Sequence, residues 1–256
     1  MRLGAGLILC AACAQALHKP PPIESIVAMP QAGVVQLLAE ADAAWARRAE
    51  PGQGAAAEDL YLQAARADPR RPESFAGAIR AKGFRLGREK DGAERGRLAE
   101  SAVILGQLCE ENSPAAASCD YWLAAALGLQ ARERTATARD ALPRMTDLLR
   151  RAARTDPALD HAGPHRLLAV VLLRAPSWPL GPGDPESALP EAETAARMAP
   201  DFPPNLLALG EALRKNGRAE HARGAYSRAL RLATDAAARG DPDASGWADE
   251  ARAGLR

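Results

Sequence analysis

The chain has 256 residues, of which 47% are hydrophobic and 25% are charged, and its formal net charge is +1. This composition is typical of a folded globular protein, and the nearly balanced charge argues against a nucleic-acid-binding surface, which needs a concentration of basic residues. Aromatic residues make up only 4% of the chain, whereas alanine, leucine and arginine are abundant, so we expect helices rather than strands.

Residues 1–16 have the features of an export signal. Arg2 precedes an apolar run from Leu3 to Ala12 that is too short to span a bilayer. Ala14-Gln15-Ala16 then fits a cleavage site for ordinary secretion. The sequence therefore predicts a protein on the periplasmic side of the cell envelope, either secreted or anchored by a lipid.

Lipidation is the interpretation that we favour. The residues up to Cys13 resemble a bacterial lipobox, although Cys10 stands where that motif prefers leucine. A lipid on Cys13 would leave residues 17–32, which include three consecutive prolines, as a semi-rigid tether. Residues 33–256 would then form the folded domain, and the membrane would be contacted only through the lipid.

One residue pattern recurs five times in the folded domain. Three small, apolar or aromatic residues are spaced by four and then three positions, which places them on one helix face. A proline follows five positions later and should end the helix. The copies are Ala57, Tyr61, Ala64 and Pro69; Ala102, Gly106, Cys109 and Pro114; Met145, Leu149, Ala152 and Pro157; Ala188, Ala192, Ala195 and Pro200; and Ala222, Tyr226 and Ala229, with Thr234 in place of proline.

The last copy also contains its partner helix. Leu206, Leu209, Gly210 and Leu213 precede the turn Asn216-Gly217, and the series resembles the tetratricopeptide pattern W-x2-L-G-x2-Y…A-x3-F…P. The resemblance implies an all-α solenoid of about five helix pairs with a C-terminal capping helix. The predicted helices cover residues 33–49, 56–67, 72–87, 93–111, 115–131, 136–155, 164–174, 185–199, 203–216, 219–236 and 242–253, with Pro143 breaking or kinking the sixth.

A narrower similarity covers residues 119–235. It is carried by Tyr121-Trp122-x-Ala124 with Gly128, by Leu142-Pro143-x-Met145, and by Asp156 followed by Asp160-His161-x-Gly163-x-His165. These residues resemble the T-component lipoproteins of tetratricopeptide-associated TRAP-type transporters. In that family a lipid-anchored helical repeat protein in the periplasm associates with a substrate-binding protein. The resemblance implies a partner protein or a small ligand, and the alternative is a general envelope assembly scaffold without a small ligand.

Five residues are predicted to contact the ligand or partner inside the superhelix: Trp122, His165, Arg166, Trp178 and Asn205. Trp178 lies in a proline-rich loop, where it could instead seal the core. We do not predict a metal site at His161 and His165, because Gly163-Pro164 separates them and the two rings should not share a helix face.

Cys109 and Cys119 flank a short loop and could form a disulfide in an exported protein, although Cys109 also fits as a small buried residue of the repeat. We predict no cofactor and no enzymatic activity, because the sequence contains no G-x-S-x-G, H-E-x-x-H or G-x-G-x-x-G motif.

Overall fold

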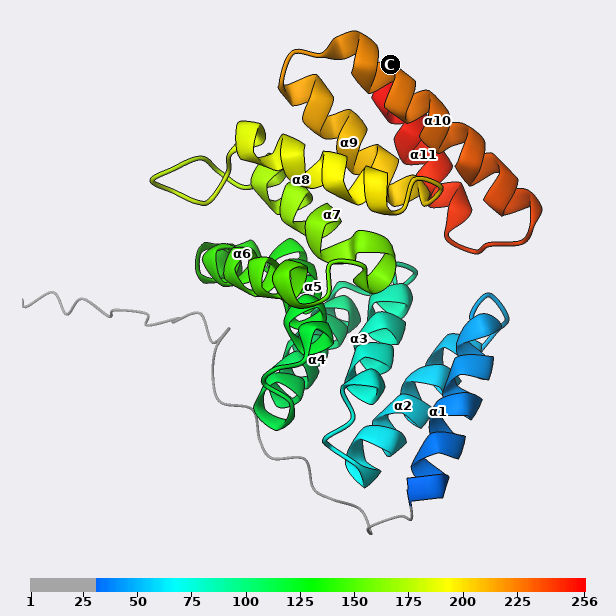
Figure 1. Ribbon diagram of the computed structural model, residues 1–256. Helices are drawn as coiled ribbons and strands as arrows, with labels where there is room; N and C mark the ends of the chain where they lie inside the picture. Colours follow the sequence, from blue (N-terminus) through cyan, green and yellow to red (C-terminus); the bar gives the residue numbers. More distant parts are fainter. Residues whose placement is uncertain (1–30) are drawn as a thin grey trace, which may run out of the picture.

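The computed structural model describes residues 31–256, and this part of the chain forms eleven α-helices and no strand (Figure 1). The helices are α1 (Gln31–Ala46), α2 (Gln53–Ala67), α3 (Pro72–Leu86), α4 (Gly92–Asn112), α5 (Ala117–Glu133), α6 (Ala138–Thr155), α7 (Leu159–Arg174), α8 (Pro185–Met198), α9 (Pro203–Lys215), α10 (Ala219–Ala238) and α11 (Ala244–Leu255). A 3-10 turn, η1 (Thr135–Thr137), precedes α6. The predicted signal, Cys13 and residues 17–30 of the predicted tether lie outside the described residues.

All eleven predicted helices are present, so the all-α prediction is confirmed. Their ends agree with the prediction to within three residues, except that α7 begins at residue 159 rather than 164. Within residues 31–256 no helix combines the length and the apolar character needed to cross a bilayer.

Prolines set where four of the helices end. α2, α4, α6 and α8 each end two residues before the proline of the repeat pattern, at Pro69, Pro114, Pro157 and Pro200. The residue before each proline leaves the helical conformation, with φ between -144° and -133°, because the proline ring disfavours a helical residue in front of it. In the fifth copy Thr234 replaces the proline, and α10 continues past it.

The predicted break at Pro143 is wrong. α6 continues through Pro143 to its end at Thr155. Proline removes only one backbone hydrogen bond of this helix, and the residues that follow, including Met145, Leu148 and Leu149, are buried. Their packing stabilises the helix enough to carry it past the proline.

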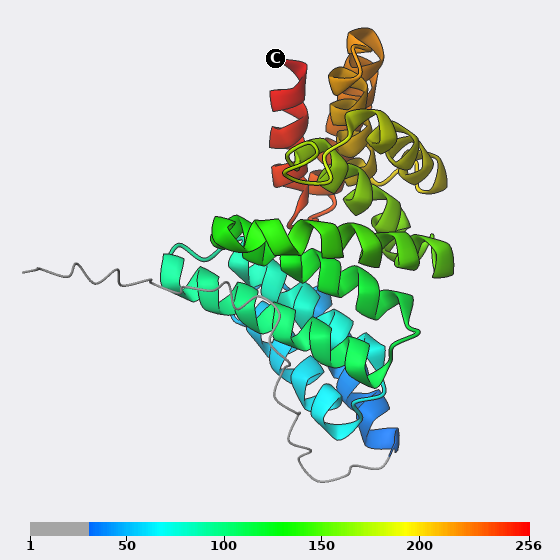
Figure 2. The ribbon, with the colours of Figure 1, turned by 90° about the vertical axis from the view of Figure 1, so that its left-hand side faces the viewer.

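The helices form hairpins that stack in two layers. Consecutive helices pack against each other, and each odd-numbered helix also packs against the next odd-numbered one. The odd-numbered helices therefore form the inner layer of a curved stack and the even-numbered helices its outer layer (Figures 1 and 2). α11 packs on α9 and α10 and covers the C-terminal end, as predicted for a capping helix.

The repeat pattern forms the buried face of the outer layer. All fifteen of its helical residues are buried, which confirms that they share one face. Small residues let the layers approach closely. A Cβ atom at Gly210 in α9, for example, would lie only 2.8 Å from Cε1 of Tyr226 in α10, which is closer than non-bonded carbons normally pack.

We predict opposite effects for two glycine-to-alanine changes in these neighbouring helices. Gly210→Ala should lower the free energy of unfolding by about 1–3 kcal/mol, because the buried Tyr226 ring would have to move. Gly224→Ala should raise it by about 0.5–1 kcal/mol, because open space surrounds Gly224 and alanine favours the helix. Urea denaturation followed by circular dichroism measures both, and equal effects would contradict the close packing.

A disulfide joins the second hairpin to the third. Cys109, near the end of α4, and Cys119, in the first turn of α5, are bonded with their Cα atoms 5.3 Å apart. Both side chains are also buried. The bond closes the turn between the two helices, and Cys109 keeps its place on the buried face of the repeat.

Candidate ligand-binding pocket

Two arginines connect the first hairpins to the last loop. Arg48, after α1, donates through Nη2 to Asp243 Oδ2 at 3.0 Å and lies 3.5 Å from Asp241. Arg88, after α3, donates to the carbonyl of Pro242 at 3.1 Å. The stack therefore curves far enough for its N-terminal and C-terminal loops to meet (Figure 1). This contact, which we call the end-to-end bridge, partly encloses the space over the inner layer.

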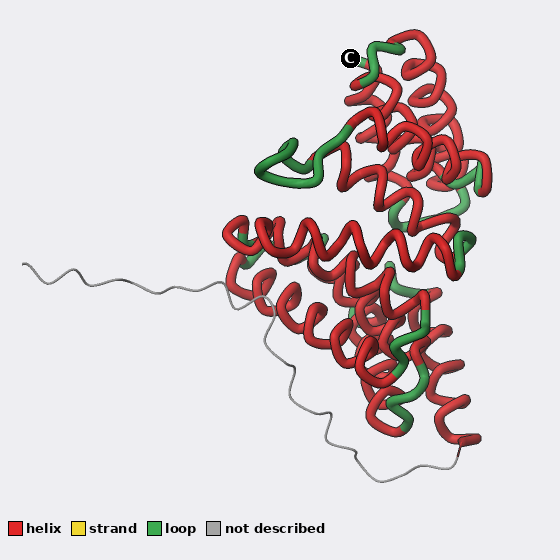
Figure 3. Tube along the Cα trace, turned by 60° about the vertical axis from the view of Figure 1, so that its left-hand side comes forward, coloured by secondary structure: helices red, strands yellow, loops and turns green. Residues whose placement is uncertain are grey.

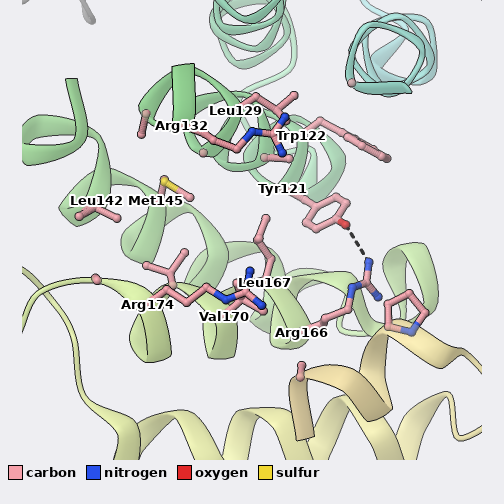
Figure 4. A pocket seen from close by; sticks show the side chains of 18 of the residues that line it. Tyr121, Trp122, Leu129, Arg132, Leu142, Met145, Arg166, Leu167, Val170 and Arg174 are labelled. Carbon is pink, nitrogen blue, oxygen red and sulfur yellow. Dashed lines mark hydrogen bonds between the residues drawn. The ribbon is translucent and has the colours of Figure 1, made fainter. Parts of the chain in front are cut away.

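A pocket of about 810 Å³ lies inside this curve. Its walls come from α3, α5, α6, α7, α9 and α11, with Ala175 and Pro176 from the loop after α7. Pockets of this size hold small organic ligands. The apolar side chains in its walls that Figure 4 labels include Trp122, Leu129, Leu142, Met145, Leu167 and Val170.

Four arginines also line the pocket: Arg80, Arg132, Arg166 and Arg174. Most of them are held by neighbouring side chains. Arg80 donates to the hydroxyl of Tyr61 at 3.0 Å. Arg174 contacts Glu211 at 2.7 Å and Glu250 at 3.1 Å, so two carboxylates balance its charge.

Arg166 holds the backbone at the start of α7. Asp160, His161 and Ala162 have left-handed backbone with φ between 48° and 62°, which residues other than glycine rarely adopt. Arg166 Nη1 donates to the carbonyls of Asp160 at 3.1 Å and His161 at 3.3 Å, and Nη2 donates to Asp160 Oδ2 at 2.8 Å. Regular helical backbone resumes at Gly163, close to the predicted start at residue 164.

Tyr121 and Asn205 complete this network. The Tyr121 hydroxyl donates to Asp160 Oδ2 at 2.5 Å. It accepts from Arg166 Nη2 at 3.1 Å (Figure 4). Burial raises the pKa of Tyr121, so its hydroxyl stays protonated. Asn205 is fully buried, donates to the carbonyl of His161 at 2.9 Å, and accepts from Arg166 at 3.0 Å. The network fixes one wall of the pocket.

Arg132 is the one arginine of the four whose carboxylate partner is already bound by another arginine. Its Nε donates to Glu133 Oε1 at 3.2 Å. Arg95 already binds the same carboxylate through two bonds, of 2.9 and 2.5 Å, and its hydrogen bonds lower the pKa of Glu133. The two terminal nitrogens of Arg132 donate no hydrogen bond to any residue of 31–256, and its side chain extends over the pocket wall beside Leu129 (Figure 4).

The structure brings only two of the five predicted contact residues to the pocket. Trp122 and Arg166 line it. His165 points to the outer layer, with Nδ1 2.6 Å from Glu191 Oε2 in α8. Asn205 lies behind the wall, where it also donates to carbonyls at the end of α8. His161 stacks on Phe202 with ring centroids 4.3 Å apart, so the two histidines have different partners. No group of three or more metal-ligating side chains occurs in residues 31–256.

Trp178 does not seal the core, and that interpretation is wrong. Its side chain is 86% exposed and that of Leu180 is 78% exposed, at the tip of the loop between α7 and α8. The loop is held at its base by backbone hydrogen bonds, from Gly183 to Pro176 at 2.8 Å and from Asp184 to the end of α7 at 2.9 Å. It therefore needs no buried side chain, and it projects from the helical stack (Figure 3). Trp178 does not line the pocket.

Sequence reasoning missed most of the pocket wall. Trp122, Leu129 and Arg132 recur along α5 at helical spacing, and Leu167, Val170 and Arg174 do so along α7. Both helices also bury an apolar face against the outer layer. A second apolar face with arginines at its ends was the signal that marked the inner surface.

The sequence matches no protein-family model and no curated protein. The fold is similar to that of TTC0263, a thermophilic tetratricopeptide-repeat protein of Thermus thermophilus, with a TM-score of 0.60 and 22% identity over 85% of this chain and 98% of that chain. A crystal structure of MamA gives a TM-score of 0.49 and 17% identity over 80% of this chain and 93% of that chain. The likeness to TTC0263 shows that the chain has the tetratricopeptide-type helical-repeat fold.

Proposed function

We propose that this chain is an exported binding protein, which uses the inside of its superhelix to hold a ligand or part of a partner protein. The observation that carries the proposal is the partly enclosed pocket, which is mostly apolar and lined by four arginines. Concave surfaces of solenoids are their usual binding surfaces. Binding is favoured over catalysis because the side chains lining the pocket in residues 31–256 include no serine, cysteine or histidine.

The more specific form of the proposal is a lipid-anchored T-component of a TRAP-type solute uptake system, with a periplasmic substrate-binding protein as partner. The resemblance of residues 119–235 supports it. Five of the residues that carry the resemblance line the pocket: Tyr121, Trp122, Gly128, Leu142 and Met145. Capture of interacting proteins from native membranes tests it. A substrate-binding protein among the partners supports the transport role, whereas envelope assembly proteins alone would contradict it.

The location can be tested at Cys13. If Cys13 carries the lipid, Cys13→Ala should move the mature protein from the membrane fraction to the soluble periplasm. Its thermal unfolding should not change, because Cys13 precedes the predicted repeat domain. Cell fractionation and mass spectrometry of the N-terminus measure the two outcomes. An unmodified N-terminus at Leu17 would show ordinary secretion instead.

A scaffold without a small ligand is the second candidate, and the exposed loop favours it. Tryptophan in a rigid, exposed loop is a common centre of protein interfaces, because little conformational entropy is lost when it binds. Trp178→Ala should change the free energy of unfolding by no more than about 0.5 kcal/mol, since the side chain is exposed. It should also release the captured partner.

Val35→Ala is the matched control for this prediction, because Val35 is another exposed apolar residue, 53% accessible, on α1. A partner retained by the wild type and by Val35→Ala but lost from Trp178→Ala would assign the loop to the interface. A partner retained by all three proteins would contradict that assignment.

A further inference from the structure

The pocket itself indicates the chemical class of its ligand. We propose that it binds a small amphipathic carboxylate, with the apolar body against α5, α6 and α7 and the carboxylate on Arg132. This inference rests on the proposed binding function and adds the ligand class to it. Three features of the pocket support it: its apolar walls, the balance of charge on its four arginines, and the position of the arginine that would bind an anion.

The apolar walls require an apolar body. Trp122 and Leu129 of α5, Leu142 of α6, and Leu167 and Val170 of α7 line the same cavity of about 810 Å³. Removing apolar ligand surface from water contributes about 25 cal/mol per Å². A short, strongly polar dicarboxylate would leave these walls unfilled and would lose its own hydration there.

The four arginines differ in how fully their charges are balanced by neighbouring groups. Arg166 is paired with Asp160 and Arg174 is paired with two glutamates. Arg80 donates to the neutral Tyr61 hydroxyl and lies 3.9 Å from Asp42, and its Nε is buried without a hydrogen-bond partner in residues 31–256, so it offers no free pair of terminal nitrogens to a carboxylate. Arg132 alone shares its carboxylate with a better-placed arginine, so its terminal nitrogens are free among the described residues.

The geometry of a guanidinium suits a carboxylate as the anionic group. Its two terminal nitrogens match the two oxygens of a carboxylate in a bidentate bond. Ala138, at the beginning of α6, also lines the pocket. By contrast, Glu250 lines the pocket next to Arg174 and repels a carboxylate there. The anion therefore belongs at Arg132.

Octanoate is a suitable probe, and octanamide has the same length with a neutral head. Isothermal titration calorimetry of the full chain should show tighter binding of octanoate than of octanamide. Arg132→Gln should weaken octanoate binding by about tenfold or more, the loss of one charge-assisted bond, and should leave octanamide unchanged. Arg132 is 56% exposed, so the variant should fold normally, which circular dichroism checks.

Arg134→Gln is the matched control. Arg134 is 53% exposed, lies two residues from Arg132, pairs with Glu100 at 3.3 Å, and does not line the pocket. Arg134→Gln removes the same net charge as Arg132→Gln. Octanoate binding should therefore change less than about twofold in Arg134→Gln if Arg132 acts through a direct contact rather than a long-range field. Val170→Trp should fill the pocket and abolish binding of both probes.

The outcomes separate the inference from the proposed function. Equal binding of octanoate and octanamide, or no effect of Arg132→Gln, would overturn the carboxylate assignment and leave an apolar pocket. No binding of either probe would overturn the small-ligand inference, while partner capture decides the binding function separately. The C-terminus of a partner protein is another source of a carboxylate beside apolar groups, and a trileucine peptide with a free C-terminus tests it. Binding of that peptide tighter than octanoate would overturn the assignment to a small molecule.

Discussion

Replacing Glu58 by alanine is expected to lower the free energy of unfolding by about 3–5 kcal/mol, because the change would leave a buried charge without its partner. Glu58 of α2 is only 5% exposed and accepts from two side chains of α3. Lys82 Nζ lies 2.5 Å from Oε1, and Arg85 Nη1 lies 2.6 Å from Oε2. Lys82 is 8% exposed, whereas Arg85 is 35% exposed.

Guanidinium denaturation of Glu58→Ala measures this loss. The double variant Glu58→Met, Lys82→Met should recover much of it, since apolar side chains of similar length avoid the desolvation cost of both charges. Asp147→Ala is the control for an exposed pair, because Asp147 and Arg150 lie 3.8 Å apart in solvent and the change should cost less than about 0.5 kcal/mol. Equal losses in the double and single variants would contradict the account.

The second large effect is expected at Arg166. Arg166→Met should destabilise the chain by about 3–5 kcal/mol, because it removes the donor for two carbonyls, the Asp160 carboxylate and the Asn205 side chain at once. The three left-handed residues before it would lose the bonds that hold them. Thermal unfolding and hydrogen exchange at the start of α7 measure the change.

Arg174→Met provides the comparison on the same helix. Arg174 also lines the pocket and also pairs with carboxylates, but it is 54% exposed, so its loss should cost less than about 1 kcal/mol. If the two variants were equally stable, Arg166 would be a ligand contact rather than a support for the backbone. Ligand binding measured on both variants would then separate the two roles.

The helices could be predicted because their signals are local. A proline two residues beyond the end of a helix, as at Pro69 or Pro157, acts on its own neighbours in the chain. The buried face was also readable, since Ala57, Tyr61 and Ala64 need only helical spacing to fall on one side. The same reasoning failed at Pro143, because packing of the rest of α6 outweighed the local signal.

The candidate site was much less predictable, because contacts distant in sequence form it. Arg166 bonds to Tyr121 and Asn205, which are 45 and 39 residues away. Asp160 and His161 adopt left-handed backbone without any glycine to mark it. Trp178 was predicted either to seal the core or to line the groove, but backbone bonds at the base of its loop leave it in solvent.

The end-to-end bridge has a consequence for how this fold can change in length. An open solenoid gains or loses a repeat with little disturbance, because each repeat contacts only its neighbours. Here Arg48 must reach Asp243 across the opening of the curve, and Arg88 must reach the same loop. One hairpin more or fewer would carry these partners past or short of each other. The bridge therefore ties the fold to its present number of repeats.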